Sequence, residues 1–265
     1  MKSPHNETTN RWEGKYYKSH SDWQFHFASV ALKYIQLPSD ARVLDIGCGD
    51  GRFTQHMANL VSSGTVVGLD SSPLMLSVAN SIITPNLSFI LGDATKLPSD
   101  RQFEYVTSFN CLHWVIEIKT ALEQIRNILS PGGKTLILIA PTQVKHPIHE
   151  IIIKVIKDRW SSYFTNISNI FPFHTVAKWA TLIESSGMIP EHLHLIDASL
   201  DYADEKTFAD WVAGWVPCGA ISKEDKGKFV QDVVRAYISR IPCSKSGVVH
   251  YGMDELVIVA SKPLT

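Results

Sequence analysis

Residues 43–51 read Val-Leu-Asp-Ile-Gly-Cys-Gly-Asp-Gly, an apolar run that ends in an acidic residue and a turn with three glycines. A helix-like stretch, residues 52–58, follows at once. Gly47, Gly49 and Gly51 let the backbone turn tightly and approach a ligand without a clash at Cβ. The helix that follows offers unpaired N–H groups and the positive end of its dipole. The stretch therefore predicts a binding site for a cofactor that carries adenosine and a small anionic group.

The spacing of the glycines narrows the class of cofactor. Dinucleotide-binding folds show the pattern G-x-G-x-x-G, whereas this chain has G-x-G-x-G, with Asp45 two residues before the first glycine. A second apolar run, residues 65–69, ends at Asp70. In α/β nucleotide-binding folds this position presents a carboxylate to ribose hydroxyls. The glycine spacing makes nicotinamide or flavin binding less favoured. The glycine turn and Asp70 agree in predicting a nucleotide-like cofactor.

Apolar runs and helix-like stretches alternate over the first half of the chain. Strands are predicted at residues 42–47, 65–70, 87–92, 104–109 and 134–140, and helices at 52–61, 73–83 and 115–129. The second helix has a good start signal, because Ser72 can cap it and Pro73 suits its first position. This alternation is typical of an α/β fold in which helices cover both faces of a parallel sheet.

Beyond Pro141 the alternation becomes wider. Residues 147–187 read as helical and rich in aromatic residues, 192–199 as a strand, 204–216 and 222–239 as helices, and 255–260 as a last strand. We find no internal repeat or linker, so we predict one domain over residues 1–265. Its parts are an N-terminal helical cap (1–40), a cofactor-binding core (41–140), helical insertions with the sixth strand (141–246) and the last strand (247–265). The insertions are expected to determine substrate specificity.

Composition sets limits on partners and location. The 265 residues include 25 Lys and Arg against 26 Asp and Glu, which gives no overall electrostatic reason to bind nucleic acid. The four cysteines form no C-x-x-C pair and the first residues lack the apolar core of a signal peptide, so we expect a cytoplasmic protein. No run approaches the roughly 18 apolar residues of a membrane span. Sequence alone leaves the oligomeric state unknown.

At this point the chain resembles the class I S-adenosylmethionine-dependent methyltransferases, from about residue 12 to residue 140. Three further blocks carry the resemblance: Phe-Ile-Leu-Gly-Asp-Ala at 89–94, Tyr-Val-Thr-Ser-Phe-Asn at 105–110 and Leu-Ser-Pro-Gly-Gly-Lys at 129–134. The resemblance implies a Rossmann-like sheet of seven mostly parallel strands, with helical insertions after strands five and six. It also implies that the protein is an enzyme that uses S-adenosylmethionine to methylate a small molecule.

The same resemblance assigns cofactor-binding positions. It places Asp45 at the methionine part of the cofactor, Asp70 at the ribose and Asp93 at the adenine. Met75 either flanks the adenine or belongs to the core, because it shares helical spacing with its apolar neighbours. The full set of positions is Tyr17, Asp45, Gly47, Cys48, Gly49, Asp70, Ser71, Met75, Asp93, Ala94 and Asn110. We interpret Cys48 as a small loop residue rather than a nucleophile, because no activating neighbour stands beside it in sequence.

Two segments narrow the resemblance further. Residues 12–24, ahead of the first strand, and residues 110–115, after the fourth, are similar to the juvenile hormone acid methyltransferases. They are more loosely similar to the trans-aconitate and malonyl-carrier-protein methyltransferases. By this resemblance Gln24 and Trp114 hold the carboxylate of a small-molecule acid and Tyr17 covers the cofactor. The resemblance weakens after residue 140 and leaves the identity of the acid open.

The chemistry leaves His113 with three possible roles. A carboxylic acid has a pKa of about 4, so it is ionised at neutral pH and needs no base before methyl transfer. His113 would then be a hydrogen-bond donor to the substrate, or would only orient the loop. A phenol or carbon acid in a quinone-like or polyketide-like molecule would instead need His113 as a base. For the protein as a whole, a non-enzyme alternative also stays open: a methyltransferase fold that binds the cofactor or a protein partner without turnover. The histidine pairs elsewhere lack companion ligands, so no metal site is predicted.

Overall fold

The computed structural model describes residues 22–98, 100–142, 148–164, 167, 170–216, 218–219 and 221–265. They form two compact units. The sheet unit comprises the described residues within 13–142, 173–196 and 255–265, and the insertion unit comprises those within 143–172 and 197–254. A single domain with helical insertions therefore stays a prediction.

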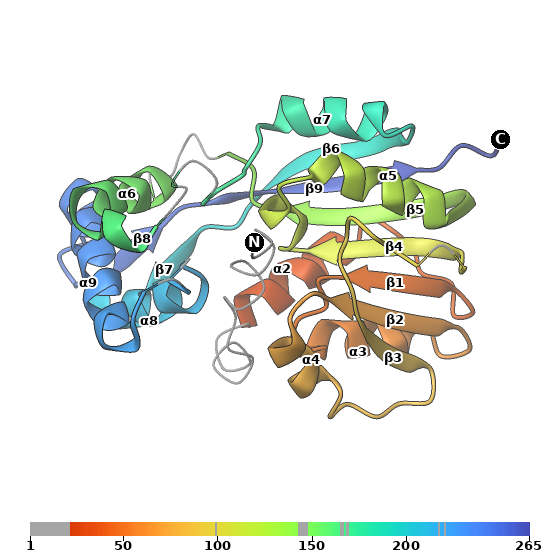
Figure 1. Cartoon of the computed structure of the whole chain (residues 1–265), viewed down its shortest axis with the longest axis horizontal. Coiled ribbons are helices and arrows are strands. Elements are labelled where there is room, and N and C mark those ends of the chain that lie inside the picture. The colour runs from red at the N-terminus through yellow and green to blue at the C-terminus, as the bar shows by residue number, and fades with distance from the viewer. Residues whose placement is uncertain are drawn as a thin grey trace. The chain divides into compact units, whose positions relative to one another are not determined.

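The sheet unit contains seven strands in the order β3-β2-β1-β4-β5-β9-β6 (Figure 1). Their bounds are β1 Arg42–Ile46, β2 Thr65–Asp70, β3 Leu87–Leu91, β4 Phe103–Phe109, β5 Leu129–Ile139, β6 Ile189–Asp197 and β9 Asp254–Ser261. Strands β1 to β5 pair in parallel, whereas β9 runs antiparallel to β5. The predicted Rossmann-like α/β fold with seven mostly parallel strands is confirmed.

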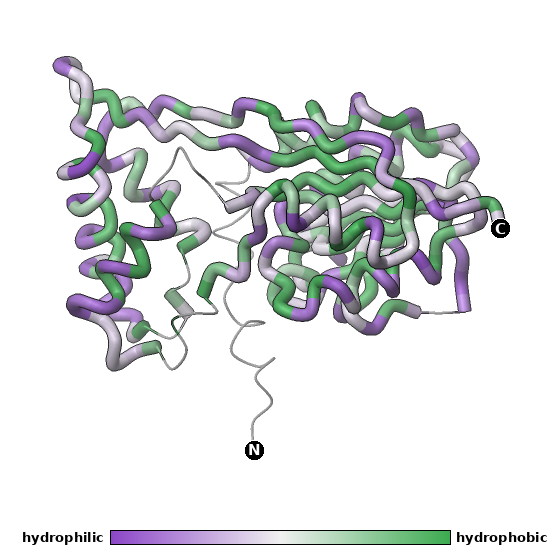
Figure 2. The backbone as a smooth tube through the Cα atoms, turned by 90° about the horizontal axis from the view of Figure 1, so that it is seen from above, coloured by the Kyte–Doolittle hydropathy of each residue, from purple (hydrophilic) through white to green (hydrophobic). Residues whose placement is uncertain are grey.

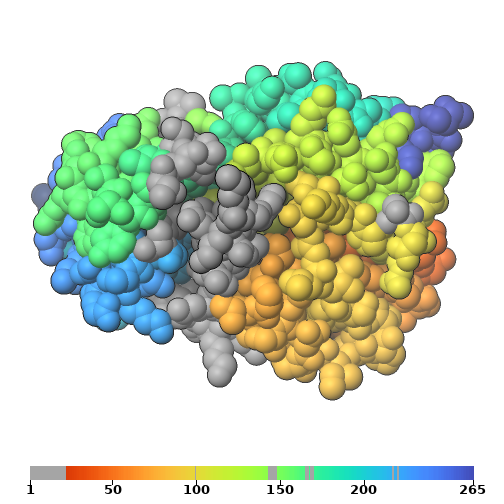
Figure 3. All heavy atoms as spheres, viewed as in Figure 1, coloured from red at the N-terminus to blue at the C-terminus, as the bar shows by residue number. Residues whose placement is uncertain are grey.

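Helices cover the sheet on both faces. They are α2 (Asp22–Leu32), α3 (Arg52–Leu60), α4 (Pro73–Ala79), the short η2 (Leu112–Trp114), α5 (Ile118–Ile128) and α7 (Val176–Ser185). Successive side chains of a strand point to opposite faces. Leu44 and Ile46 join the apolar cluster that includes α5 and α7, whereas Asp45 contacts Thr54 of α3 on the other face. Helices α5 and α7 lie side by side on their face of the sheet (Figures 1 and 3).

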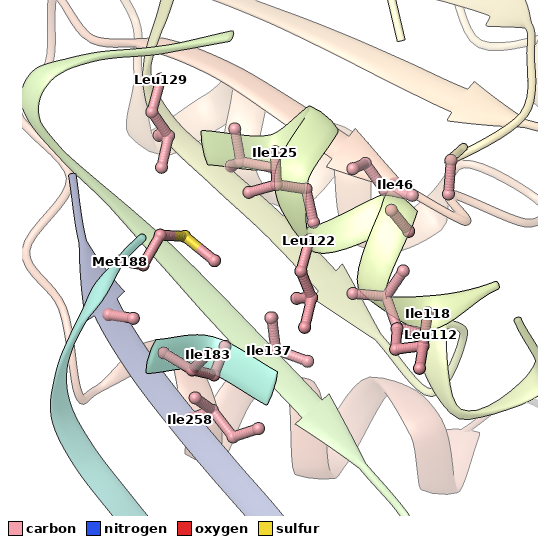
Figure 4. Close-up of a cluster of buried hydrophobic side chains, with 14 of the residues drawn as sticks. Ile46, Leu112, Ile118, Leu122, Ile125, Leu129, Ile137, Ile183, Met188 and Ile258 are labelled. Carbon is pink, nitrogen blue, oxygen red and sulfur yellow. The ribbon is translucent and has the colours of Figure 1, made fainter. Parts of the chain in front are cut away.

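The main apolar core lies between the sheet and helices α5 and α7 (Figure 4). Ile46, Ile137 and Ile258 project from three strands onto Leu122 and Ile125 of α5, and all five are buried. Hydrophobic residues predominate along the central strands (Figure 2). Truncation of such a residue to alanine typically costs about 2–5 kcal/mol. This packing makes the sheet a rigid support for the loops at its strand ends.

The insertion unit is mainly helical and packs around aromatic residues. Its elements are α6 (Ile148–Val155), η3 (Ile156–Trp160), η4 (Ser161–Tyr163), β7 (Leu200–Tyr202), α8 (Glu205–Trp215), α9 (Lys223–Arg240) and β8 (Val249–Tyr251). Phe208, Tyr237 and Tyr251 are buried against one another, with ring centroids 4.8–6.1 Å apart. Strands β7 and β8 pair antiparallel. Within the described ranges, no helix is long and apolar enough to span a membrane.

Local sequence signals explain most element boundaries. The Ser72 hydroxyl caps α4 by accepting a hydrogen bond from the Met75 N–H at 3.3 Å. Helix α4 ends at Ala79, with Asn80 as its C-cap, so the predicted end at 83 was wrong. The predicted helix 115–129 was also wrong at its start, because η2 ends at Trp114 and α5 begins only at Ile118.

Gly47 adopts a conformation and a packing that only glycine allows. Its φ is +75°, in the left-handed region. A Cβ atom at this position would overlap the Cβ and Sγ atoms of Cys111. The Gly47 N–H donates to the Leu69 carbonyl oxygen at 2.7 Å, which ties the glycine turn to the end of β2. The turn therefore has little freedom to move aside for a side chain.

Gly47→Ala should destabilise the protein by about 3 kcal/mol or more, because it adds a steric overlap to the cost of a positive φ. Gly247→Ala is the matched control, since Gly247 has a φ of +87° but nothing within 4 Å of an added Cβ. The control should lose only about 1 kcal/mol. Urea unfolding of both variants measures the difference. Equal losses would show that the turn relaxes around the methyl group.

Candidate cofactor and substrate site

One carboxylate connects the glycine turn to the start of α4. Asp70, at the end of β2, accepts a hydrogen bond from the Gly49 N–H at Oδ2 (2.9 Å) and from the Ser72 N–H at Oδ1 (2.8 Å). Burial raises the pKa of Asp70, and these N–H donors act in the opposite direction. Asp70 thus fixes the turn to the start of α4. Each oxygen keeps further acceptor capacity for a ligand hydroxyl.

Asp45 is a buried carboxylate that joins three elements. It lies on β1 and is 3% exposed. Its Oδ2 accepts from the Thr54 hydroxyl of α3 at 2.7 Å, and its Oδ1 accepts from the Thr107 hydroxyl of β4 at 3.0 Å. Burial raises its pKa from 3.8 to about 6, although the two threonine hydroxyls lower it. Asp45 is therefore mainly ionised at neutral pH, at a cost in stability.

A cleft opens beside Asp45 and the glycine turn. Helix α2 contributes Gln24, Phe25 and Ala28 to it. The remaining lining residues are Asp45, Gly47, Cys48, Gly49, Asp50, Arg52, Phe53 and Phe109. Its polar lining residues are Gln24, Asp45, Asp50 and Arg52, together with the backbone of the turn, and its apolar surface includes three phenylalanines.

Gln24 and the phenylalanines form two distinct parts of this cleft. Phe53 contacts Phe25 and Phe109, with ring centroids 5.2 and 4.7 Å away. The Oε1 atom of Gln24 is buried and has no hydrogen-bond partner within the described part of the chain. The Gln24 side chain and this apolar wall line the same cleft.

His113 and Trp114 lie at the start of the segment that follows β4. The Ala140 N–H donates to Nδ1 of His113 at 3.1 Å, so the neutral ring carries its proton on Nε2. Phe173 contacts the rings of both residues, with centroids 4.7 Å from His113 and 5.2 Å from Trp114. His113 is buried and Trp114 is half-buried. In this tautomer His113 can donate a hydrogen bond from Nε2 but cannot accept a proton there.

The other predicted cofactor residues lie outside this cleft lining. Met75 is buried in the first turn of α4, and Ser71 is exposed at the end of β2. Asp93 accepts hydrogen bonds from the N–H and the hydroxyl of Thr95, both at 2.8 Å. Ala94 belongs to the main apolar core. Tyr17 lies outside the described residues. The structure thus brings Gln24, Asp45, Gly47, Cys48 and Gly49 together, and the roles of all these residues stay predictions.

Sequence reasoning did not identify Glu255 as a neighbour of Asn110; Nδ2 of Asn110 and both carboxyl oxygens of Glu255 are buried without a hydrogen-bond partner among the described residues. Asn110 adopts a φ of +54°, and its N–H donates to the Leu138 carbonyl oxygen at 2.8 Å. The Glu255 carboxyl is 0% exposed, and burial raises its pKa to about 8, with the Asn110 side chain acting in the opposite direction. A glutamate at the first position of the predicted strand 255–260, which is otherwise apolar, was the available signal.

Arg52, Phe53, Thr54, Thr107 and Phe109 were also missed. Arg52, Phe53 and Thr54 belong to the first turn of α3, directly after the glycine turn. Thr107 pairs with Asp45 across β1 and β4, so its role depends on strand register. The sequence shows only that Arg52, Phe53 and Thr54 directly follow the glycine turn. Across the described ranges, no group of three His, Cys, Asp or Glu residues is placed to hold a metal ion.

Comparisons with known proteins find similarity to methyltransferases. The family described as "Methyltransferase domain" matches residues 43–133. A protein of Invertebrate iridescent virus 6 that is assigned as methyltransferase 235L is 26% identical, with 88% of each chain aligned. Trans-aconitate 2-methyltransferase of Streptomyces avermitilis is 27% identical, over 77% of this chain and 78% of its own. Juvenile hormone acid O-methyltransferase of Drosophila melanogaster is 29% identical, over 66% of this chain and 63% of its own.

Solved structures share the fold at lower identity. A Bacillus halodurans protein assigned as a methyltransferase has a TM-score of 0.65 at 20% identity, with 92% of this chain and 99% of that chain covered. A Haemonchus contortus phosphoethanolamine N-methyltransferase, solved with S-adenosylhomocysteine, has a TM-score of 0.63 at 15% identity. That alignment covers 99% of this chain and 61% of the other.

Asp45→Asn should separate stability from cofactor binding. Ionisation of Asp45 costs stability as the pH rises from about 4 through 6, so the neutral variant should be more stable than the parent at pH 8, by about 1–2 kcal/mol. The difference should vanish near pH 4, where Asp45 is protonated. Affinity for S-adenosylmethionine, a cation, should fall about tenfold at pH 8.

Thermal unfolding and titration calorimetry at both pH values measure these effects. Asp100→Asn is the control, because the Asp100 side chain is 74% exposed and should show neither change. A variant at Asp45 that is less stable than the parent at pH 8 would contradict the stated cost of burying the charge.

Proposed function

Because this chain is a class I S-adenosylmethionine-dependent methyltransferase by its methyltransferase domain, its relatives and its fold, we propose that it forms the methyl ester of a small organic or fatty acid. The observation that carries the proposal is that the Gln24 side chain and an aromatic wall line the same cleft. An amide N–H is a suitable donor to a carboxylate, and Phe25, Phe53 and Phe109 offer apolar surface to the rest of an acid. Two relatives are named as methyltransferases of acids, trans-aconitate and juvenile hormone acid.

The residues of the site fit S-adenosylmethionine. The glycine turn allows close approach of a ligand, Asp70 offers acceptors to ribose hydroxyls, and Asp45 faces a cleft that suits the charged methionine part. When bound, the cofactor supplies an electrophilic methyl group on a sulfonium. These assignments follow from the charge and hydrogen-bonding capacity of the residues.

Methylation of a carboxylate requires mainly that the protein position the acid and the cofactor's methyl group. A carboxylic acid is ionised at neutral pH, so no side chain has to remove a proton. Fixed orientation of the reacting groups can contribute about 7–11 kcal/mol. Gln24 would hold the acid, with Trp114 and the Nε2–H of His113 as further donors of the right kind. The phenylalanine wall would exclude water from the carboxylate, and fixed donors would replace that water.

The first test is transfer of labelled methyl from S-adenosylmethionine to a panel of acceptors. The panel contains fatty, isoprenoid, di- and tricarboxylic acids, with phenols and quinols alongside. We expect a product from an acid whose label is released by mild base, as an ester requires. A base-stable product from a phenol or quinol would instead support the alternative with His113 as base. No transfer to any acceptor, with cofactor binding intact, would support a non-catalytic fold.

Gln24→Ala should lower kcat/KM for the accepted acid by about 10- to 100-fold, because it removes a hydrogen bond to a charged group. Gln124→Ala, a half-buried glutamine of α5, is the matched control and should leave the rate unchanged. Steady-state kinetics with labelled cofactor measures both. A native rate for Gln24→Ala would show that another group grips the acid.

His113→Asn should slow methylation of an acid by no more than about tenfold and leave its pH dependence unchanged between pH 6 and 8. The reason is that a donor role for Nε2 needs no change of protonation. A base role predicts a loss of about 10²-fold or more and the disappearance of a titration near neutral pH. The pH profile of kcat/KM for the parent and the variant distinguishes the two roles.

A further inference from the structure

Arg52 is the first residue of α3, directly after the glycine turn, and lines the cleft. Its guanidinium donates from both Nη1 and Nη2 to Oδ1 of Asp22, at 3.0 Å each. The same group lies over the Phe25 ring, 5.4 Å from its centroid. Arg52 thus joins the start of α2 to the start of α3, at the mouth of the cleft that we assign to the methionine part of the cofactor.

The charges around this cleft are unequal. Asp45 and Asp50 are acidic and buried, and Oδ2 of Asp50 has no hydrogen-bond partner in the described part of the chain. Arg52 is the one cation among the described residues that line the cleft. The methionine part of S-adenosylmethionine carries two positive groups, a sulfonium and an ammonium, and one carboxylate. The acids suit the positive groups, so a partner is still needed for the carboxylate.

The ion pair between Arg52 and Asp22 is partly exposed to solvent. The Asp22 side chain is 85% exposed and that of Arg52 is 34% exposed. Exposed ion pairs of this kind contribute about 0–1 kcal/mol. The two bonds from Arg52 to Asp22 converge on one carboxylate oxygen rather than on two. A planar guanidinium can instead bind both oxygens of one carboxylate, which is the stronger arrangement.

We infer that Arg52 recognises the carboxylate of the cofactor's methionine part, and that Asp22 occupies the guanidinium in the unliganded protein and competes with that carboxylate. Arg52 lies outside the set of cofactor-binding residues predicted from sequence. Its proposed role concerns the cofactor and does not depend on which acceptor is methylated.

The test compares two ligands that differ only in the carboxylate. They are S-adenosylhomocysteine and its decarboxylated analogue, 5′-deoxy-5′-(3-aminopropylthio)adenosine, and titration calorimetry measures their binding to the full chain. Arg52→Gln should weaken S-adenosylhomocysteine about tenfold and leave the analogue unchanged. Asp22→Asn should tighten S-adenosylhomocysteine about threefold, again without effect on the analogue.

A matched control removes a different exposed arginine of the same unit. Arg42, on β1, forms an ion pair with Glu104 away from the cleft lining, so Arg42→Gln should change neither affinity. If Arg52→Gln weakens both ligands equally and lowers the melting temperature, Arg52 only fastens α2 to α3 and the inference fails. It also fails if Arg52→Gln leaves the affinity for S-adenosylhomocysteine unchanged.

Discussion

The burial of one carboxylate, Asp45, is the constraint on which the site depends. Its two oxygens accept hydroxyl hydrogen bonds from Thr54 of α3 and Thr107 of β4, so a strand, a helix and the neighbouring strand meet at one charge. Burial raises its pKa to about 6, and two neutral hydroxyls compensate only part of that cost. A cation in the adjoining cleft would compensate the rest. The fold thus keeps a charge that favours ligand binding at the expense of its own stability.

The acidic character of the cleft also bears on what happens after methyl transfer. S-adenosylmethionine becomes S-adenosylhomocysteine when the sulfonium loses its methyl group and with it a positive charge. Asp45 and Asp50, both buried beside the glycine turn, would therefore interact more favourably with a cofactor bound there than with its product. One set of carboxylates can both select the reactive form and ease release of the spent one. Under the assignment proposed above, Arg52 would instead contact a carboxylate that both forms share.

The sheet unit could be predicted from sequence because its signals are local. The apolar runs of β1 and β2, the glycine turn and the Ser72 cap each occupy a few adjacent residues, and the structure places all of them as expected. Strands β7 and β8 were missed because they are three residues long and pair across α8 and α9. The contact of Thr107 with Asp45 depends on strand register, and the contact of Arg52 with Asp22 on how α2 packs. Neither can be read from periodicity. Gln24 came from the family resemblance alone.

Two buried carboxyl groups of the sheet unit are in opposite protonation states at neutral pH. Glu255, with a pKa near 8, is mainly protonated, whereas Asp45, with a pKa near 6, is mainly ionised. The difference follows from their neighbours, since two hydroxyls serve Asp45 but only the Asn110 side chain lowers the pKa of Glu255. Protonated Glu255 therefore places no second negative charge beside Asn110. The charge of the site is thereby kept at the glycine turn, where a cationic cofactor would bind.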